Sequence, residues 1–227
     1  MKKLLRKLKR LFRKNSRNDS YYYYNNYKSK YAYYDRKNFI DNIYKLIEIL
    51  NPKFSDTTKH IKSSLAITPY SLVFGSNSKL IVRQLGTPAF IHDNTNYVQG
   101  HYTYFYKKKI GNYKLLIQLH FLNDILFFVC TEIYANNDLT RRDKHKIVQL
   151  IFQKYGTPEV EEDGNILVKL EDNNGNIMFT RDESEFFICY LSNNSDIKEL
   201  ASTLKWKQEK IREEKEKIIN KRLMKNL

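Results

Sequence analysis

The sequence predicts an α+β fold made of tandem duplicated α-βββ units, which form an antiparallel sheet with helices on one face. Two short strings recur in the same order along the chain, and turn signals leave only a few residues between strand-like segments. Such short connections require antiparallel pairing. A basic N-terminal arm and a long C-terminal helix flank this duplicated body.

The duplication is inferred from two pairs of matching strings. Residues 80–88 (LIVRQLGTP) align with residues 150–158 (LIFQKYGTP) at an offset of 70. Residues 127–130 (FFVC) align with residues 186–189 (FFIC) at an offset of 59. Either match alone is weak evidence. Because the two matches are collinear, we interpret them as one repeated unit.

Each copy is expected to begin with an amphipathic helix. Ser76 is placed to cap the first, and Thr140 with Asp143 forms a capping-box pattern for the second. A glycine can supply the left-handed residue that ends a helix, and a nearby proline prevents the helix from resuming. These stop signals are Gly86 with Pro88 and Gly156 with Pro158. The residues expected to face inward are Leu80, Ile81 and Leu85 in the first helix, and Ile147, Leu150, Ile151 and Tyr155 in the second.

Three strands are expected after each helix. In the first copy they cover about residues 97–106, 113–121 and 125–134; in the second, about 166–170, 176–180 and 185–191. Turn signals separate them at residues 109–112, at Asn123-Asp124 and at residues 172–175. Each copy is therefore predicted to be a helix followed by a three-stranded meander.

The junction between helix and strand in the first copy carries a family resemblance. Gly75, Ser76 and Ser78, then an apolar helix, then residues 85–88 (LGTP), resemble the small repeats of beta-lactamase-inhibitor-protein-like folds and related outer-membrane assembly lipoprotein domains. The resemblance covers about residues 70–191. It implies a tandem α/β unit whose curved sheet binds another protein, and it implies no catalytic residues.

Five segments follow from these patterns: residues 1–34 (basic arm and Tyr-rich linker), 35–69, 70–135, 136–192 and 193–227. Segment 35–69 is expected to be helical and to pack on the body. Its apolar spacing predicts one helix over residues 39–50, ended by Pro52, and a shorter one around residues 56–65.

The last segment contains no Gly or Pro from Asp196 to Asn226 and predicts a long charged helix. Apolar residues recur there every seven positions, at Ile197, Leu204, Ile211 and Ile218. Charged residues at the intervening core positions argue against a stable coiled coil. A solvated helix is the first interpretation, and self-association, nucleic-acid contact and membrane contact are the alternatives.

The positions of the charges matter more than their sum. The chain has 40 Lys+Arg and 25 Asp+Glu, a formal net charge of +15. Residues 1–34 carry +10, residues 205–227 carry +5, and residues 35–204 balance to zero. A neutral body with two basic ends is therefore expected, and attraction to polyanions is confined to those ends.

The N-terminal arm has the pattern of a basic amphipathic helix. Leucine and phenylalanine recur at helical spacing, and basic residues fill the other positions. The apolar set is Leu4, Leu5, Leu8, Leu11 and Phe12; the basic set is Lys2, Lys3, Arg6, Lys7, Lys9, Arg10, Arg13 and Lys14. This pattern favours attachment to an anionic membrane surface. The alternatives are an end that docks on the body or forms no stable helix, nucleic-acid binding, and an organelle-targeting presequence.

Candidates for chemistry are few. His101 and His120 could meet if their strands pair, although surface or core-edge histidines are the simpler expectation. Cys130 and Cys189 occupy equivalent strand positions and are expected to be small buried hydrophobes. Two cysteines cannot form a disulfide framework or a four-ligand zinc site, which favours a reducing compartment. No catalytic residue, metal or cofactor is therefore expected, nor a small-molecule substrate.

The first functional hypothesis is a non-catalytic protein-interaction module, cytoplasmic and peripheral to an anionic membrane surface. The longest uninterrupted apolar run, Ile125–Cys130, has six residues, so no membrane-spanning helix is expected. Tyr102, Tyr104 and Tyr106 alternate along one strand and are the candidate surface for an unidentified protein partner, if that face is open. Nucleic-acid binding through the basic tails is the alternative, and an enzyme using His101 and His120 is a third hypothesis.

Overall fold

The computed structural model describes residues 28–135, 138–156 and 166–226. The chain divides into two compact units, Met1–Asn38 and Phe39–Leu227. In the first unit, residues 28–37 form a helix, which overlaps the end of the predicted Tyr-rich linker. The basic arm, residues 1–14, lies outside the described residues. The sheet and the other helices belong to the second unit.

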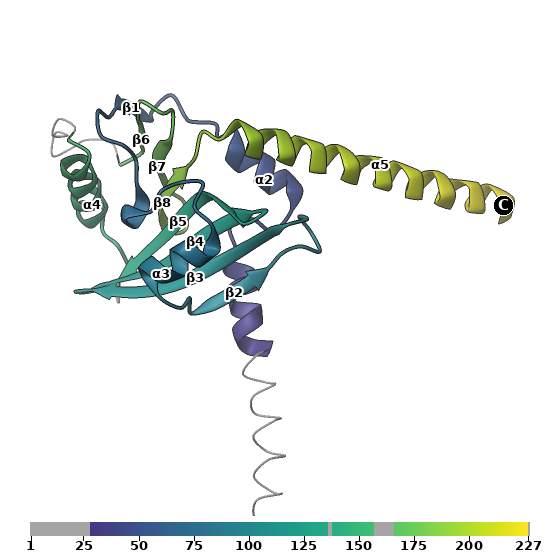
Figure 1. Ribbon diagram of the computed structural model, residues 1–227, viewed down its shortest axis with the longest axis horizontal. Helices are drawn as coiled ribbons and strands as arrows, with labels where there is room; N and C mark the ends of the chain where they lie inside the picture. The colour runs from purple at the N-terminus through teal and green to yellow at the C-terminus, as the bar shows by residue number, and fades with distance from the viewer. Residues whose placement is uncertain (1–27, 136–137, 157–165, 227) are drawn as a thin grey trace, which may run out of the picture. The chain divides into compact units, whose positions relative to one another are not determined.

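The second unit is built on one eight-stranded sheet, so the predicted α+β class is confirmed (Figure 1). The strand order is β1-β6-β7-β8-β5-β4-β3-β2. The sheet is mixed rather than purely antiparallel, because β1 pairs with β6 in parallel while every other pair is antiparallel. The strands are β1 (Lys59–Lys62), β2 (Phe90–Asp93), β3 (His101–Ile110), β4 (Tyr113–Leu122), β5 (Ile125–Ala135), β6 (Val168–Glu171), β7 (Ile177–Asp182) and β8 (Phe186–Leu191).

Two meanders meet at the centre of this sheet. Strands β3, β4 and β5 form one, β6, β7 and β8 form the other, and β5 pairs with β8. In that central pair Cys130 lies directly opposite Cys189, and these are the residues that the sequence alignment makes equivalent. The short strand β2 extends the first meander beyond β3. No local pattern predicted it.

Two helices, one from each predicted copy, pack on what we call the first face of the sheet. They are α3 (Ser78–Leu85) and α4 (Arg141–Lys154). The face contains alternate strand residues such as Leu119, Phe121 and Ile188, which share one apolar cluster with Ile81 of α3 and Phe152 of α4. The prediction of helices on one face holds for this pair.

The helix ends agree with the sequence in part. The capping box of α4 is present, because the Asp143 backbone N–H donates to Thr140 Oγ1 (3.2 Å) and the Thr140 N–H donates to the Asp143 carboxylate (3.0 Å). The cap of α3 is Asn77 rather than Ser76; its side-chain oxygen accepts from the Leu80 N–H. Gly86 has the positive φ (81°) expected where α3 ends.

Two of the residues expected to face inward do not. Leu80 is 42% exposed and Leu150 is 56% exposed. Their neighbours Ile81 and Ile151, with Val148 and Phe152, form the buried side of the two helices. Adjacent helix positions are rotated by about 100°, so Leu80 and Leu150 lie at the side of the buried stripe that contains Ile81 and Ile151, and the predicted inward face was too wide.

Different helices cover the opposite, second face. Helix α2 (Ile43–Leu50) is capped by Asn42 and buries Ile43, Leu46, Ile49 and Leu50 against it. The first turns of α5 (Ser195–Asn226) contribute Ile197 and Ala201 to the same cluster and lie beside α2 (Figure 1). This covering is made by segments outside the two predicted copies.

The predicted helix around residues 56–65 is wrong. That segment contains β1, which joins the edge of the sheet through backbone bonds from Lys59 N–H to Leu167 C=O and from Ser63 N–H to Glu171 C=O. The chain then crosses the first face, where Ile67 is buried and its N–H donates to the Asp172 carboxylate (2.9 Å). This segment therefore forms a strand because β6 offers a free edge to pair with, and no local sequence pattern predicts it.

Candidate functional site

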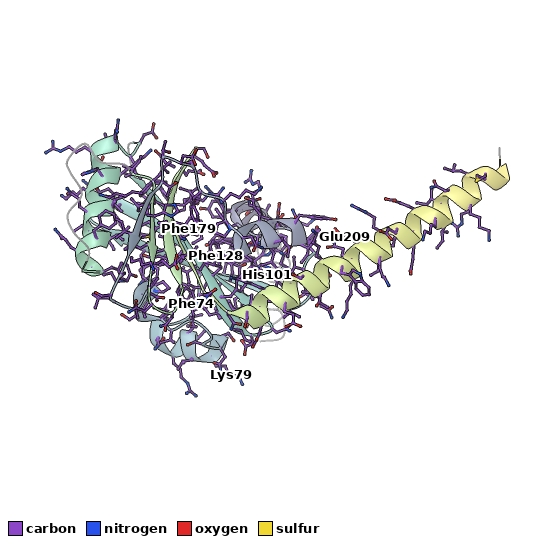
Figure 2. The ribbon with its side chains drawn as sticks, turned by 90° about the horizontal axis from the view of Figure 1, so that it is seen from above. Phe74, Lys79, His101, Phe128, Phe179 and Glu209 are labelled. Carbon is purple, nitrogen blue, oxygen red and sulfur yellow. The ribbon has the colours of Figure 1, made fainter. Side chains whose placement is uncertain are left out.

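A group of buried histidines lies on the second face, where β2, β3 and β4 run side by side. His92, Thr103 and His120 are neighbours in register across these three strands, and His101 precedes Thr103 on β3. All three histidines are at most 1% exposed. We call them the histidine cluster; Figure 2 labels His101 within the packed body.

His101 and His120 do meet. The Nε2 atom of His101 lies 3.2 Å from Nδ1 of His120, and the two rings stack with centroids 5.4 Å apart and an angle of 14° between their planes. Antiparallel pairing of β3 and β4 brings together two residues that are 19 positions apart in the chain. Which way each side chain points along its strand could not be read from the sequence alone.

The hydrogen bonds define where the protons sit. The Asn94 side-chain amide donates to the Ile40 carbonyl (2.9 Å) and to His101 Nδ1 (3.1 Å), which must therefore be an acceptor. The proton of His101 is then on Nε2, which donates to Nδ1 of His120. His120 in turn carries its proton on Nε2, an atom without a hydrogen-bond partner among the described residues. Both rings are neutral in this arrangement.

Burial reinforces the neutral state. It lowers the pKa of His101 to about 3, with a further lowering from His92 and a partial compensation from Asp93. Burial also holds the pKa of His120 well below its usual value, and His101 and His92 add to that effect. A charged imidazole at either position would have to be desolvated beside another histidine.

The surroundings of the histidine cluster indicate a structural role. His120 packs near the Phe128 ring (centroids 5.3 Å apart) and His101 near Phe127 (6.4 Å). Both histidines are completely buried, so a substrate could reach neither ring. Two amides beside the cluster hold the segment that precedes α2: Asn94, which also binds His101, donates to the Ile40 carbonyl, and Gln118 accepts from the Phe39 N–H (2.9 Å). Sequence reasoning missed Asn94 and Gln118, since a buried amide leaves no local pattern.

The tyrosine row lies on the first face, as alternation along β3 predicts, but this face is covered. Tyr106 is only 5% exposed, and its hydroxyl donates to the Gly86 carbonyl (3.0 Å). Tyr102 and Tyr104 are half-buried and pack on the Phe121 ring (centroids 5.0 Å apart in both cases). Tyr106 thus belongs to the core, and only Tyr102 and Tyr104 retain surface for a partner.

An open groove lies between the end of α2 and strand β7, with a volume of about 610 Å³. Several charged residues at its wall already form ion pairs within the body. Arg181 binds Glu183, and Asp182 binds Lys144 (2.6 Å). The lining residues include Ile47, Pro52, Lys53, Phe54, Phe179 and Arg181. Because much of the charge is compensated internally, the groove does not select a class of ligand.

Helix α5 changes character along its length. Ile197 and Ala201 are buried, and Tyr44 of α2 still receives a hydrogen bond from Arg212 (3.3 Å). Every described side chain from Lys210 to Met224 is exposed. The exposed apolar residues there are Ile211, Ile218, Ile219, Leu223 and Met224.

Within residues 28–135, 138–156 and 166–226, no three His, Cys, Asp or Glu side chains are grouped so that they could hold a metal ion. None of the helices in these same ranges is both long and apolar enough to span a bilayer.

No model of a known protein family matches this chain, and no curated protein matches its sequence. Two solved structures are similar in part. An extracellular protein containing a SCP domain from Bacillus anthracis is 10% identical, with 62% of this chain and 50% of that chain covered and a TM-score of 0.28. A cysteine-rich secretory protein from Staphylococcus aureus is 9% identical, with 60% and 51% covered and a TM-score of 0.30.

The predicted resemblance to beta-lactamase-inhibitor-protein-like repeats is wrong: the two similar solved structures are a protein containing a SCP domain and a cysteine-rich secretory protein. The motif behind it was a helix ended by Gly86 and followed by Pro88. That combination ends helices in many unrelated folds, so it does not specify one family. The chain spans about half the length of each solved protein, and at these TM-scores the likeness carries no inference about function.

Proposed function

We propose that this protein is a non-catalytic interaction module, attached peripherally to an anionic membrane surface by residues 1–14, on the cytoplasmic side. The observation that carries the proposal is the partition of charge: +10 in residues 1–34, zero in residues 35–204 and +5 in residues 205–227. The excess charge therefore lies outside the part of the chain that builds the sheet and its covering.

The apolar residues of the arm favour a lipid surface over other polyanions. Leu4, Leu8 and Leu11 recur at helical spacing among eight basic residues. A helix in the membrane interface buries such a row below the headgroups, whereas phosphate contacts alone do not need it. Each Lys or Arg near an anionic surface contributes about 1 kcal/mol, so half of the eight would supply about 4 kcal/mol.

The packed body supports an interaction role over a catalytic one. Helices cover both faces of the sheet, and the histidine pair is completely buried. A protein partner would therefore contact the margins of the body, such as the half-buried Tyr102 and Tyr104, or the exposed length of α5.

Vesicle co-sedimentation tests the membrane attachment. The full chain should sediment with vesicles of phosphatidylserine and phosphatidylcholine at low salt, and much less with phosphatidylcholine alone. The variant Leu4→Gln/Leu8→Gln/Leu11→Gln keeps every charge and should lose this binding. The matched variant Lys3→Gln/Lys7→Gln/Arg10→Gln keeps the leucines and should bind roughly a hundredfold more weakly, since about 1 kcal/mol is lost per charge. Equal sedimentation of the full chain and a chain without residues 1–14 would refute the proposal.

Nucleic-acid binding is the second candidate, favoured by the positive charge at both ends. It predicts an affinity that falls steeply with salt, with a log-log slope of about 0.9 per phosphate neutralised. The leucine variant separates the two functions, because it should bind a nucleic-acid duplex as well as the wild-type chain does.

A further inference from the structure

Two thiols face each other at the centre of the sheet. Cys130 on β5 and Cys189 on β8 are directly opposite in the antiparallel register, and both are completely buried. The Cys189 thiol donates to the sulfur of Cys130, with the two Sγ atoms 3.7 Å apart. They share the apolar cluster of the second face with Phe128 and Phe187.

We propose that Cys130 and Cys189 are a disulfide-forming pair, and that they become linked when the chain folds in the presence of a disulfide oxidant such as oxidised glutathione. One cysteine thiolate attacks glutathione disulfide, forms a mixed disulfide and releases one glutathione thiolate. The second cysteine thiolate then attacks the protein sulfur of that mixed disulfide and releases the other glutathione. The two cysteines lose two protons and two electrons, and two molecules of reduced glutathione carry them away.

The backbone geometry suits this bond. Opposite residues of an antiparallel pair have Cα atoms about 4.5 or 5.5 Å apart, and disulfides span Cα separations of about 4.4–6.8 Å. Both side chains already point to the same face, so rotation of the side chains can bring the sulfurs to the bonding distance of about 2.05 Å. The two strands need not move apart or change register.

Burial decides when the bond can form. It raises the pKa of the Cys130 thiol well above its usual value, and the neighbouring Cys189 sulfur adds to that effect. A thiol that is buried and protonated exchanges slowly, because the thiolate is the reactive species. The linkage therefore forms fastest while the chain folds, and once β5 and β8 have paired, exchange with glutathione is slow because it requires this strand pair to open.

The bond would join the two meanders at the point where they meet. It would close a loop between cysteines 59 residues apart in the chain, and closing a long loop restricts the unfolded state strongly. The sheet would then be held covalently at its central strand pair.

The test measures the same disulfide in two states of the full chain. Reduced protein is equilibrated with mixtures of reduced and oxidised glutathione, once under refolding conditions and once in concentrated guanidinium, and is then quenched with acid and alkylated. Mass spectrometry counts the molecules that lack both alkyl groups, and peptide mapping identifies the link between residues 130 and 189. The equilibrium constant should be at least about a hundredfold larger in the folded state, and the oxidised protein should melt about 10 °C higher than the reduced one.

A control moves one thiol to the other face. In the double variant Cys189→Ser/Ile188→Cys, the new cysteine lies on the first face, in the cluster that contains Ile188. The equilibrium constant for its disulfide with Cys130 should be no larger in the folded state than in guanidinium. Equal equilibrium constants for the folded and unfolded wild-type chain would overturn the proposal, and so would an equal gain in the control.

Discussion

Both faces of the sheet are covered, but by different segments of the chain. Helices α3 and α4 of the predicted copies cover the first face, where tyrosine hydroxyls are prominent among the buried polar groups; burial raises the pKa of Tyr106 to about 12. Helix α2 and the start of α5 cover the second face, which holds the histidine pair and the thiol pair. Acid and disulfide oxidants should therefore change the free energy of unfolding through groups on the second face.

The largest expected effect tests whether the two faces form one cooperative core. Phe121→Ala opens a cavity on the first face and Phe128→Ala on the second; both rings are completely buried. Each variant should lose about 3–5 kcal/mol of unfolding free energy. Urea denaturation followed by circular dichroism should show one transition in each case. The exposed Ile110→Ala is the control, and a second transition confined to one variant would show that the faces unfold separately.

The next largest effect should be a loss of unfolding free energy in acid, caused by the histidine pair on the second face. A histidine with a depressed pKa in the folded state contributes stability above its unfolded pKa, about 6.5, and that stability is lost as the pH falls below this value. His101 and His120 both have lowered pKa values, so the free energy of unfolding should drop by about 2–3 kcal/mol between pH 7.5 and 5.5.

Variants assign this pH dependence to the pair. In His101→Gln/His120→Gln the slope of stability against pH should nearly vanish over this range, whatever the absolute stability of the variant. The exposed His60→Gln should keep the wild-type slope. If the double variant also kept it, another group would be responsible for the acid response.

The smallest expected effect concerns the far part of α5. A chain that ends after Glu213 keeps the Arg212 contact to Tyr44 and loses only exposed side chains among the described residues. Its unfolding free energy should change by less than about 0.5 kcal/mol. Ile197→Ala, in the first turns of the same helix, should cost about 2–4 kcal/mol by the same denaturation measurement. A large loss on truncation would mean that the exposed part stabilises the body.

Local signals predicted much of the central sheet. The strands expected at residues 113–121 and 125–134 are observed at Tyr113–Leu122 and Ile125–Ala135. They were predictable because short turn sequences mark their ends and apolar runs lie between those turns. The capping box of Thr140 and Asp143 was also predictable from the sequence, since its two partners are only three residues apart. The domain boundaries and the membrane-binding arm stay predictions.

Long-range contacts decided what the sequence could not show. β1 exists because β6 offers a free edge 109 positions further along the chain, at the pairing of Lys59 with Val168. The meeting of His101 with His120 depends on strand register and on the face to which each residue points. Their partner Asn94 was missed for the same reason.

By itself the sequence determined the α+β class, the order of the central strands along the chain, and the placement of net charge at the two ends. These properties depend on composition and on neighbours a few residues apart. Only the tertiary structure decided that both faces of the sheet are covered, that Tyr106 is core rather than surface, and that Cys130 lies opposite Cys189. The physical reason is that burial and contact at these positions are produced by segments far apart in the chain, and no local pattern encodes which distant segment will pack there.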